Sequence, residues 1–228
     1  MVYEPYKKTI SARQVTRVVY WVWIFFPYFL RKPLTALGLL WILGMKKVFR
    51  VNSRNEMTPT EKLGNLSFWG VPEVDLDDYR LRVGGLCENE LELDFKAILA
   101  RPAIERPTRM DCVGGFRNNS VMKGFLLADL VAESSPMADA ETAVFRCADD
   151  FFTTSRLSDL EAADALLVYE VNGERLARFG SPLRLAIPGL YGYKWAKWIT
   201  DIDIVSGFPP GYWEKRGLPK RGRVGDIW

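Results

Sequence analysis

The chain of 228 residues contains no histidine, and this absence narrows its possible chemistry more than any other feature of its composition. Histidine is the usual general base near neutral pH and the commonest protein ligand for zinc, haem iron and copper. A Ser-His-Asp triad, a zinc site of the HExxH type and a histidine-ligated haem are therefore excluded. Any redox chemistry of this chain must depend on a cofactor that other residues hold.

Cysteine is scarce as well. The sequence has Cys87, Cys112 and Cys147, and no two of them form a CxxC pair. This spacing argues against a zinc knuckle or an iron–sulfur cluster held by one chain. The odd number argues against a disulfide framework, although one bridge and one free thiol would also fit. Each cysteine could instead be a small buried apolar residue.

The bulk composition is that of a globular protein, with 48% hydrophobic and 26% charged residues. The net charge is only +3. No stripe of Lys and Arg interleaved with aromatic residues occurs outside the two ends, so we expect no nucleic-acid partner.

The chain changes character near residue 50, which predicts an arm over residues 1–50 and a folded domain over residues 51–228. Two apolar runs, 18–30 and 34–45, flank Arg31-Lys32-Pro33. As a helix, each run would reach only about 20 Å against a hydrocarbon core of roughly 30 Å. One continuous span would place two charges in mid-membrane, and the proline would break the helix, although many apolar neighbours could offset this cost in a distorted span.

We therefore predict a monotopic hairpin or two interfacial helices, which would contact a membrane surface or a membrane subunit through residues 15–50. The alternative is a hydrophobic arm that docks on a partner subunit. The basic flanks, and the lack of a recognisable export signal, favour a membrane-associated protein on the cytoplasmic face, with the extracytoplasmic face as the alternative. The segment 215–223 packs five basic residues among Gly and Pro. It is either a solvated tail or a contact for an anionic cofactor, partner or lipid headgroup.

From Asn52 onward, short strand-like segments alternate with Gly and Pro turns, which predicts a sheet-dominated α+β domain. Residues 79–83, for example, alternate between apolar and polar and end at Gly84-Gly85. A strand edge and then a short helix are expected over 91–99. Further strands are expected at 109–113, 143–147, 166–171, 183–187 and 197–205, and helices at 125–132 and 158–165.

Two segments carry chemistry. Cys112 is followed by Val113-Gly114-Gly115, where glycines permit a tight turn and a soft thiolate could bind a metal. Residues 180–198 interleave Arg184, Lys194 and Lys197 with glycines and aromatic rings. Convergent cations suit a phosphate group, and flat apolar walls suit a ring system. A surface loop with chance charges is the alternative.

The order of these motifs resembles the molybdopterin-binding domain of the sulfite oxidase superfamily. It is most similar to the short bacterial members that include the protein-methionine-sulfoxide reductase catalytic subunit, and the resemblance covers about residues 64–228. The motifs that carry it are Cys-Val-x-Gly from Cys112, Ala-Asp-x-Phe at 148–151, Asn172-Gly173-Glu174, Gly-x-Pro-Leu-Arg at 180–184, Tyr-Gly-Tyr-Lys-x-x-Lys-Trp at 191–198 and Gly-Tyr-Trp-Glu at 211–214.

The resemblance implies a sulfite-oxidase-like molybdopterin-binding fold and a molybdenum–molybdopterin cofactor (Mo-MPT) whose metal is ligated by Cys112. It assigns Asp149 to the substrate pocket, and we expect Arg117 to steer an anionic substrate. The chain departs from the family at Phe179, where members usually have histidine. The residues expected to bind the cofactor are Arg184, Gly192, Tyr193, Lys194, Lys197, Asn65 and Phe68.

We therefore expect a molybdenum-dependent oxidoreductase that transfers an oxygen atom to or from a small substrate, sulfur-containing or related. This chain has no haem or cluster ligands, so an external or membrane-bound electron carrier is implied. The alternative is a non-catalytic or electron-transfer accessory subunit of a membrane complex that retains the fold.

Overall fold

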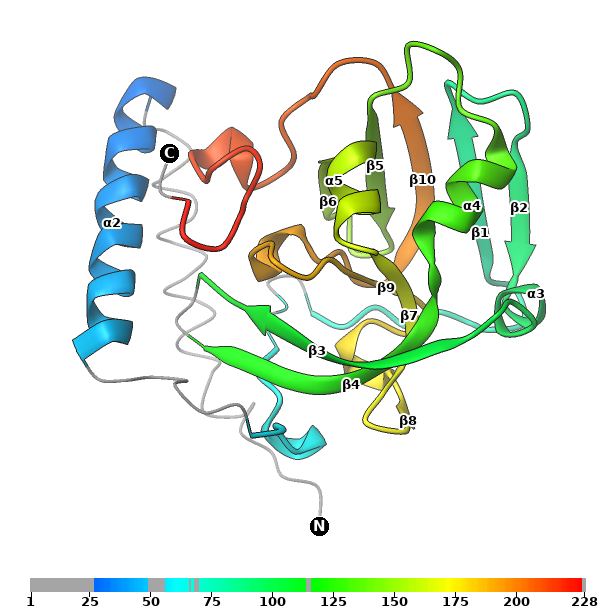
Figure 1. Cartoon of the computed structure of the whole chain (residues 1–228), viewed down its shortest axis with the longest axis horizontal. Helices are drawn as coiled ribbons and strands as arrows, with labels where there is room; N and C mark the ends of the chain where they lie inside the picture. Colours follow the sequence, from blue (N-terminus) through cyan, green and yellow to red (C-terminus); the bar gives the residue numbers. More distant parts are fainter. Residues whose placement is uncertain (1–26, 49–55, 66, 68–69, 114–115, 227–228) are drawn as a thin grey trace.

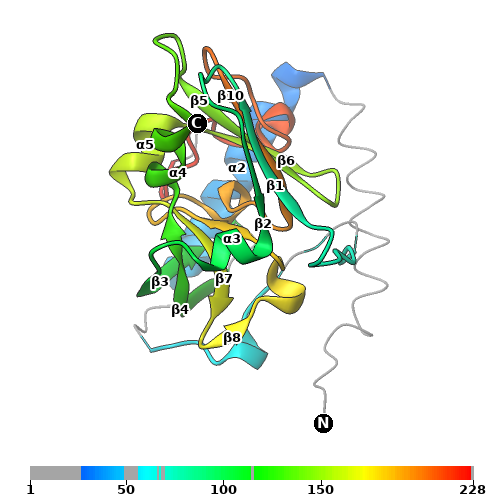
Figure 2. The same ribbon diagram turned by 90° about the vertical axis from the view of Figure 1, so that its right-hand side faces the viewer.

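The computed structural model describes residues 27–48, 56–65, 67, 70–113 and 116–226. Two five-stranded sheets dominate this part of the chain (Figure 1). Short helices lie beside them, and Figure 2 shows the first sheet standing above the second. The predicted sheet-dominated α+β architecture is confirmed.

The first sheet has the strand order β2-β1-β10-β5-β6. Strands β1 and β10 run parallel, and the other neighbours are antiparallel. Alternate residues of β10, Ile202 and Ile204, are fully buried. The strands are β1 (Arg80–Gly85), β2 (Leu91–Asp94), β5 (Thr142–Cys147), β6 (Phe152–Arg156) and β10 (Ile199–Val205).

The second sheet has the order β3-β4-β7-β8, with β9 also paired to β7. Its central strand, β7, is buried on both faces: Leu167 and Tyr169 join the core that the first sheet shares, and Leu166 and Val168 join a second core. This explains the unbroken apolar run in β7. The strands are β3 (Ile104–Asp111), β4 (Arg117–Leu126), β7 (Leu166–Val171), β8 (Glu174–Arg175) and β9 (Arg184–Ala186).

The helices of the domain are short. The Asp94 carboxylate caps α3 by accepting a hydrogen bond from the Ala97 N–H, 2.7 Å away. The buried side chains of Leu130 and Leu160 fix α4 and α5 to the main core. The helices and 3₁₀ turns are α3 (Phe95–Leu99), α4 (Leu127–Ser134), α5 (Leu157–Ala162), η2 (Thr60–Lys62), η3 (Ala177–Phe179), η4 (Gly192–Lys194) and η5 (Glu214–Arg216).

Each strand and helix predicted after residue 52 has a counterpart in the structure, but β4, β6 and the two-residue strand β8 were not predicted. The two longer strands are the informative cases. Both strands bury polar side chains: Asn118 and Ser120 in β4, and Thr153, Thr154 and Ser155 in β6. The inward faces therefore lack the apolar alternation that identifies a half-buried strand.

The predicted break at Pro33 is wrong. A single helix, α2 (Tyr28–Val48), runs through this proline. Pro33 is the sixth residue of the helix, so the hydrogen bond it removes is the one its own amide would have made to Phe29. The rest of the helix follows without interruption. The earlier part of the first apolar run lies outside the described residues.

Helix α2 packs against the end of the domain. Ala36 and Leu39 are buried, and the Thr35 hydroxyl donates to the carbonyl of Arg216, 3.5 Å away. Among the described residues, no helix has the length and apolar character that crossing a bilayer requires. The division of the chain at residue 50 stays a prediction.

Candidate functional site

Strand β3 carries Cys112 into the interior. The strand ends at Asp111, which forms a parallel bridge with Tyr191, and the Cys112 side chain that follows is buried. The Cys112 N–H donates to the carbonyl of Phe116, 2.9 Å away, and so closes a tight loop. Gly114 and Gly115, where the sequence predicts a tight turn, lie outside the described residues. The first chemical motif therefore lies beside the second.

Gly192 shows how closely the two motifs approach. A Cβ atom at this position would lie 3.3 Å from Sδ of Met110 and 3.6 Å from the carbonyl oxygen of Asp111. A side chain there would have to displace the Met110 side chain slightly, so little free space separates η4 from the end of β3. The glycine thus lets the 190s segment lie against the residues that lead into Cys112.

Arg184 is a buried cation with incomplete hydrogen bonding. Its Nη1 donates to the carbonyl of Phe179 at 3.1 Å, its Nη2 lies 3.8 Å from Sδ of Met110, and its buried Nε has no hydrogen-bond partner. It forms no ion pair with any carboxylate in the described part of the chain. Burial lowers the pKa of this guanidinium to about 10. A buried guanidinium of this kind lowers the free energy of unfolding unless an anion compensates its charge.

Lys197 faces Arg184 across an antiparallel bridge. Its Nζ donates to Oδ1 of Asn65 at 2.8 Å and to Oγ of Ser67 at 3.1 Å. Burial, and then the nearby charge of Arg184, lower the pKa of Lys197 to about 7. Negative charge on Asp149, Cys147 and Cys112 opposes this shift, so these groups share the electrostatic environment of Lys197.

Asp149 lies in the turn between β5 and β6 and is half-buried. Burial raises the pKa of its carboxyl group, whereas a hydrogen bond from the Phe151 N–H (3.3 Å) and the charge of Lys197 lower it. The net shift is upward, so this carboxyl group holds a proton at higher pH than an exposed aspartate. The Ala148 N–H donates to the carbonyl of Trp198, which keeps this turn next to Lys197.

Arg117, at the start of β4, forms an ion pair with Asp111. Its Nη2 and Nε lie 2.8 and 2.9 Å from Oδ1 of Asp111, a buried carboxylate. Arg109 approaches the other carboxylate oxygen at 3.9 Å. The predicted steering residue is therefore held beside the residue that precedes Cys112.

Lys194 and Tyr193 have different surroundings from the other predicted residues. The fully buried ammonium of Lys194 pairs with the Glu214 carboxylate and donates to the carbonyl of Thr154 at 2.8 Å. The Tyr193 hydroxyl donates to the carbonyl of Pro219 at 2.6 Å. These contacts tie η4 to the C-terminal segment, and a cofactor contact by either residue stays a prediction. Phe68 lies outside the described residues.

Residues 56–65 and Ser67, called the strap below, reach the site across β4. Asn118 holds it through reciprocal bonds with the backbone of Gly64, whose N–H donates at 2.9 Å and whose carbonyl accepts at 2.8 Å. A Cβ atom at Gly64 would lie 2.5 Å from the Phe116 ring. The strap therefore passes directly over the Cys112 loop and delivers Asn65 to Lys197.

Four residues had not been identified from the sequence as part of the site: Met110, Asp111, Asn118 and Ser67. Ser67 stands two residues after a predicted position, and that proximity was the only signal for it. The other three act through strand pairing, which sequence spacing alone does not reveal.

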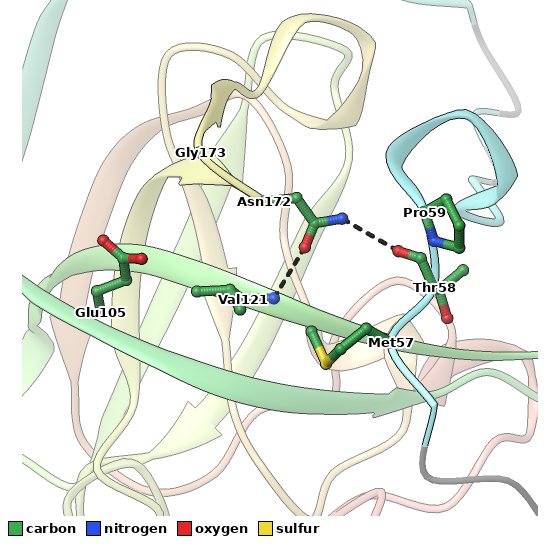
Figure 3. A pocket seen from close by; sticks show the side chains of 7 residues that line it. All are labelled: Met57, Thr58, Pro59, Glu105, Val121, Asn172 and Gly173. Carbon is green, nitrogen blue, oxygen red and sulfur yellow. Dashed lines mark hydrogen bonds between the residues drawn. The ribbon is translucent and has the colours of Figure 1, made fainter.

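The outer part of the strap borders an open pocket of about 430 Å³ (Figure 3). None of the residues predicted to bind the cofactor, the metal or the substrate lines this pocket. Its lining includes Met57, Thr58 and Glu105. Asn172 closes one side: its Oδ1 accepts from the Val121 N–H at 2.9 Å, and its Nδ2 donates to the carbonyl of Thr58 at 3.0 Å. We assign this part of the Asn-Gly-Glu motif to anchoring the strap.

Comparison with known proteins matches residues 68–213 to the family model described as the oxidoreductase molybdopterin binding domain. An uncharacterized oxidoreductase of Bacillus subtilis (strain 168), YuiH, is 32% identical over 156 residues, which are 68% of this chain and 77% of that protein. The putative protein-methionine-sulfoxide reductase subunit YedZ1 of Azospira oryzae is 30% identical over 64% of this chain and 56% of its own length.

A sulfite oxidase of Arabidopsis thaliana is 27% identical over 70% of this chain, which spans 50% of that protein. The chain thus spans about half the length of these last two relatives. The crystal structure of the sulfane dehydrogenase SoxCD from Paracoccus pantotrophus superposes with a TM-score of 0.57 at 24% identity, over 60% of this chain and 41% of that one. At this identity the likeness shows the fold.

Proposed function

Because the chain belongs to the oxidoreductase molybdopterin-binding domain family, we propose that it transfers an oxygen atom to or from a small sulfur-containing or related substrate. Membership confirms, at the level of the family, the predicted molybdopterin-dependent oxidoreductase and its molybdenum–molybdopterin cofactor. The choice of substrate is supported by the names of two relatives, a protein-methionine-sulfoxide reductase subunit and a sulfite oxidase.

The residues present fit this cofactor. The observation that carries the proposal is the buried Arg184, whose Nε lacks a hydrogen-bond partner, opposite the half-buried Lys197. An anionic phosphate would neutralise these cations and accept a hydrogen bond from the Nε–H of Arg184. The Cys112 thiol, in the same electrostatic environment, is a soft ligand suited to the metal. When bound, the molybdenum centre supplies the two-electron redox change of the reaction.

We assign the remaining groups to binding and proton handling. Asn65 and Ser67 orient the Lys197 ammonium through its two hydrogen bonds. Asp149, with its raised pKa, would hold or release the proton that accompanies oxygen transfer. Arg117, although paired with Asp111, leaves its side chain partly exposed and would attract an anionic substrate.

An external or membrane-bound electron carrier completes this proposal. Two electrons must enter or leave for each turnover, and the sequence offers no histidine for a haem. The name of one relative, a subunit, supports a partner protein. Membrane association through residues 15–50, with the cytoplasmic side as the expected face, stays a prediction.

The test is the molybdenum and pterin content of protein expressed in a host that makes the cofactor. We expect near-stoichiometric amounts of both in the wild-type protein and a loss of both in Arg184→Met. Arg178→Met, which removes a partly exposed guanidinium that lies over the Phe179 ring, should retain the cofactor. Less than about a tenth of an equivalent in the wild type would contradict the enzyme and favour the accessory-subunit alternative.

A further inference from the structure

Helix α2 has an apolar outer face. Phe29, Leu37 and Trp41 are 71%, 62% and 68% exposed. Leu30, Leu34 and Leu40 are also exposed, and their spacing of three and four residues places all six on one side of the helix. Figure 1 shows α2 at the edge of the molecule, away from both sheets. Exposed apolar side chains gathered in this way mark an interaction surface.

A basic segment that lies far away in the sequence packs against the domain-facing side of the same helix. The close contact is at Gly217, where a Cβ atom would lie 2.9 Å from the Thr35 hydroxyl and 3.2 Å from the carbonyl of Arg31. The bond from Thr35 to the Arg216 carbonyl closes the same contact. The start of the segment 215–223 therefore packs against α2, and the exposed cations of the segment are Lys215, Lys220, Arg221 and Arg223.

The charges around the surface are mostly positive. Helix α2 has no acidic residue, and Arg31 and Lys32 lie in its first turns. Just before the segment, the carboxylate of Glu214 is buried against Lys194. Asp159 binds both Arg221 and Arg223, so one carboxylate is shared by two guanidinium groups. The result is an apolar face bordered by excess positive charge.

We propose that the outer face of α2 and the segment 215–223 form one surface that docks on an anionic lipid bilayer, with α2 lying in the plane of the interface. Helices with Trp, Phe and Leu on one side and cations beside them bind membranes in this orientation. The cations match the negative headgroups, and the indole of Trp41 suits the headgroup level.

A second copy of the chain fits this surface less well. A symmetric dimer through α2 would bring two basic segments against each other, and like charges across an interface oppose association. A protein partner is also disfavoured because the exposed face offers few hydrogen-bonding groups, whereas protein interfaces form them regularly. A fluid hydrocarbon boundary requires none.

The test is co-sedimentation of the full chain with vesicles of phosphatidylcholine, with or without phosphatidylglycerol. We expect binding to the anionic vesicles that weakens with added salt. Leu37→Asp/Trp41→Asp should lower the partition coefficient at least about tenfold. Lys215→Glu/Lys220→Glu should remove the preference for anionic vesicles. Molybdenum content is measured on the same samples, so a failure to bind lipid is distinguished from a failure of the proposed enzyme function.

The matched control is Leu99→Asp/Met137→Asp, which places two acidic groups at exposed apolar positions of other elements, one of them in α3. Figures 1 and 2 show α3 on the opposite side of the molecule from α2. This control should bind as the wild type does. Equal binding by Leu37→Asp/Trp41→Asp would overturn the proposal. A wild-type dimer that this variant makes monomeric, without lipid binding, would assign the face to a second copy and overturn it as well.

Discussion

The ammonium of Lys197 lies 2.8 Å from Oδ1 of Asn65, a residue 132 positions earlier in the sequence. The contact joins the strap to the segment that enters β10. It also gives a half-buried cation, which faces Arg184, a neutral hydrogen-bond acceptor. The cofactor-free protein therefore holds two like charges close together, and several properties of the site follow from this.

The stability of the cofactor-free protein should rise with pH above neutral. Lys197 has a pKa of about 7 in the folded chain and 10.5 as its ordinary value, so between these pH values the unfolded state binds more protons. The destabilisation by the buried charge is full below pH 7 and is relieved as the pH increases. Denaturant unfolding at pH 6.5 and 9 should show this gain.

Lys197→Met removes the titrating group and is the comparison for that experiment. It should be more stable than the wild type at pH 6.5, and the difference should shrink by pH 9. A constant difference between the two proteins at both pH values would show that Lys197 does not titrate in this range.

Cys112→Ala should lose activity but keep its cofactor. The thiolate is the assigned metal ligand, whereas the phosphate contacts belong to Arg184 and Lys197. We expect turnover to fall more than about 100-fold and the thiolate-to-metal absorption to disappear, with molybdenum retained. Cys147→Ala, which alters another buried thiol, is the control and should keep both signals. Unchanged absorption in Cys112→Ala would refute the ligand assignment.

Asn118→Ala should release the strap. The amide makes two hydrogen bonds with the Gly64 backbone, and their loss should lower the free energy of unfolding by about 1–3 kcal/mol. Because Asn65 follows Gly64, the variant should also lose pterin faster during dialysis. Asn119→Ala cuts a more distal bond, to the Glu56 carbonyl, and should retain pterin. Equal pterin loss in the two variants would argue against a positioning role for Asn118.

Glu214→Gln should be strongly destabilising. Its carboxylate is 2% exposed and pairs with the fully buried ammonium of Lys194. Removing one partner leaves a charge uncompensated, and we expect a loss of about 3–5 kcal/mol in chemical denaturation. The double variant Lys194→Met/Glu214→Leu should be less destabilised than Glu214→Gln. If the double variant is less stable than Glu214→Gln, the ion pair stabilises the fold by more than the mutual compensation of its two charges.

Much of the fold followed from local pattern. Strand β7 was predicted over its full length because its continuous apolar run requires burial on both faces. Strands β4 and β6 were not predicted, because Ser120, Thr153 and Thr154 are buried at positions where apolar residues would have revealed the strand. Their polarity is tolerated only in the neighbourhood that the folded chain provides.

The sequence by itself determined the chemical possibilities: the absence of histidine excluded whole classes of site, and the motifs at Cys112 and at 180–198 predicted a metal held by sulfur beside cations. The tertiary structure decided where each cation of these motifs lies and which group it faces. It buries Arg184 opposite Lys197 but pairs Lys194 with Glu214, although both lysines belong to one short motif. It also carried α2 straight through Pro33 and packed the start of the basic segment against this helix. Spacing in the sequence fixes which residue types are available, whereas strand pairing and packing fix which of them meet.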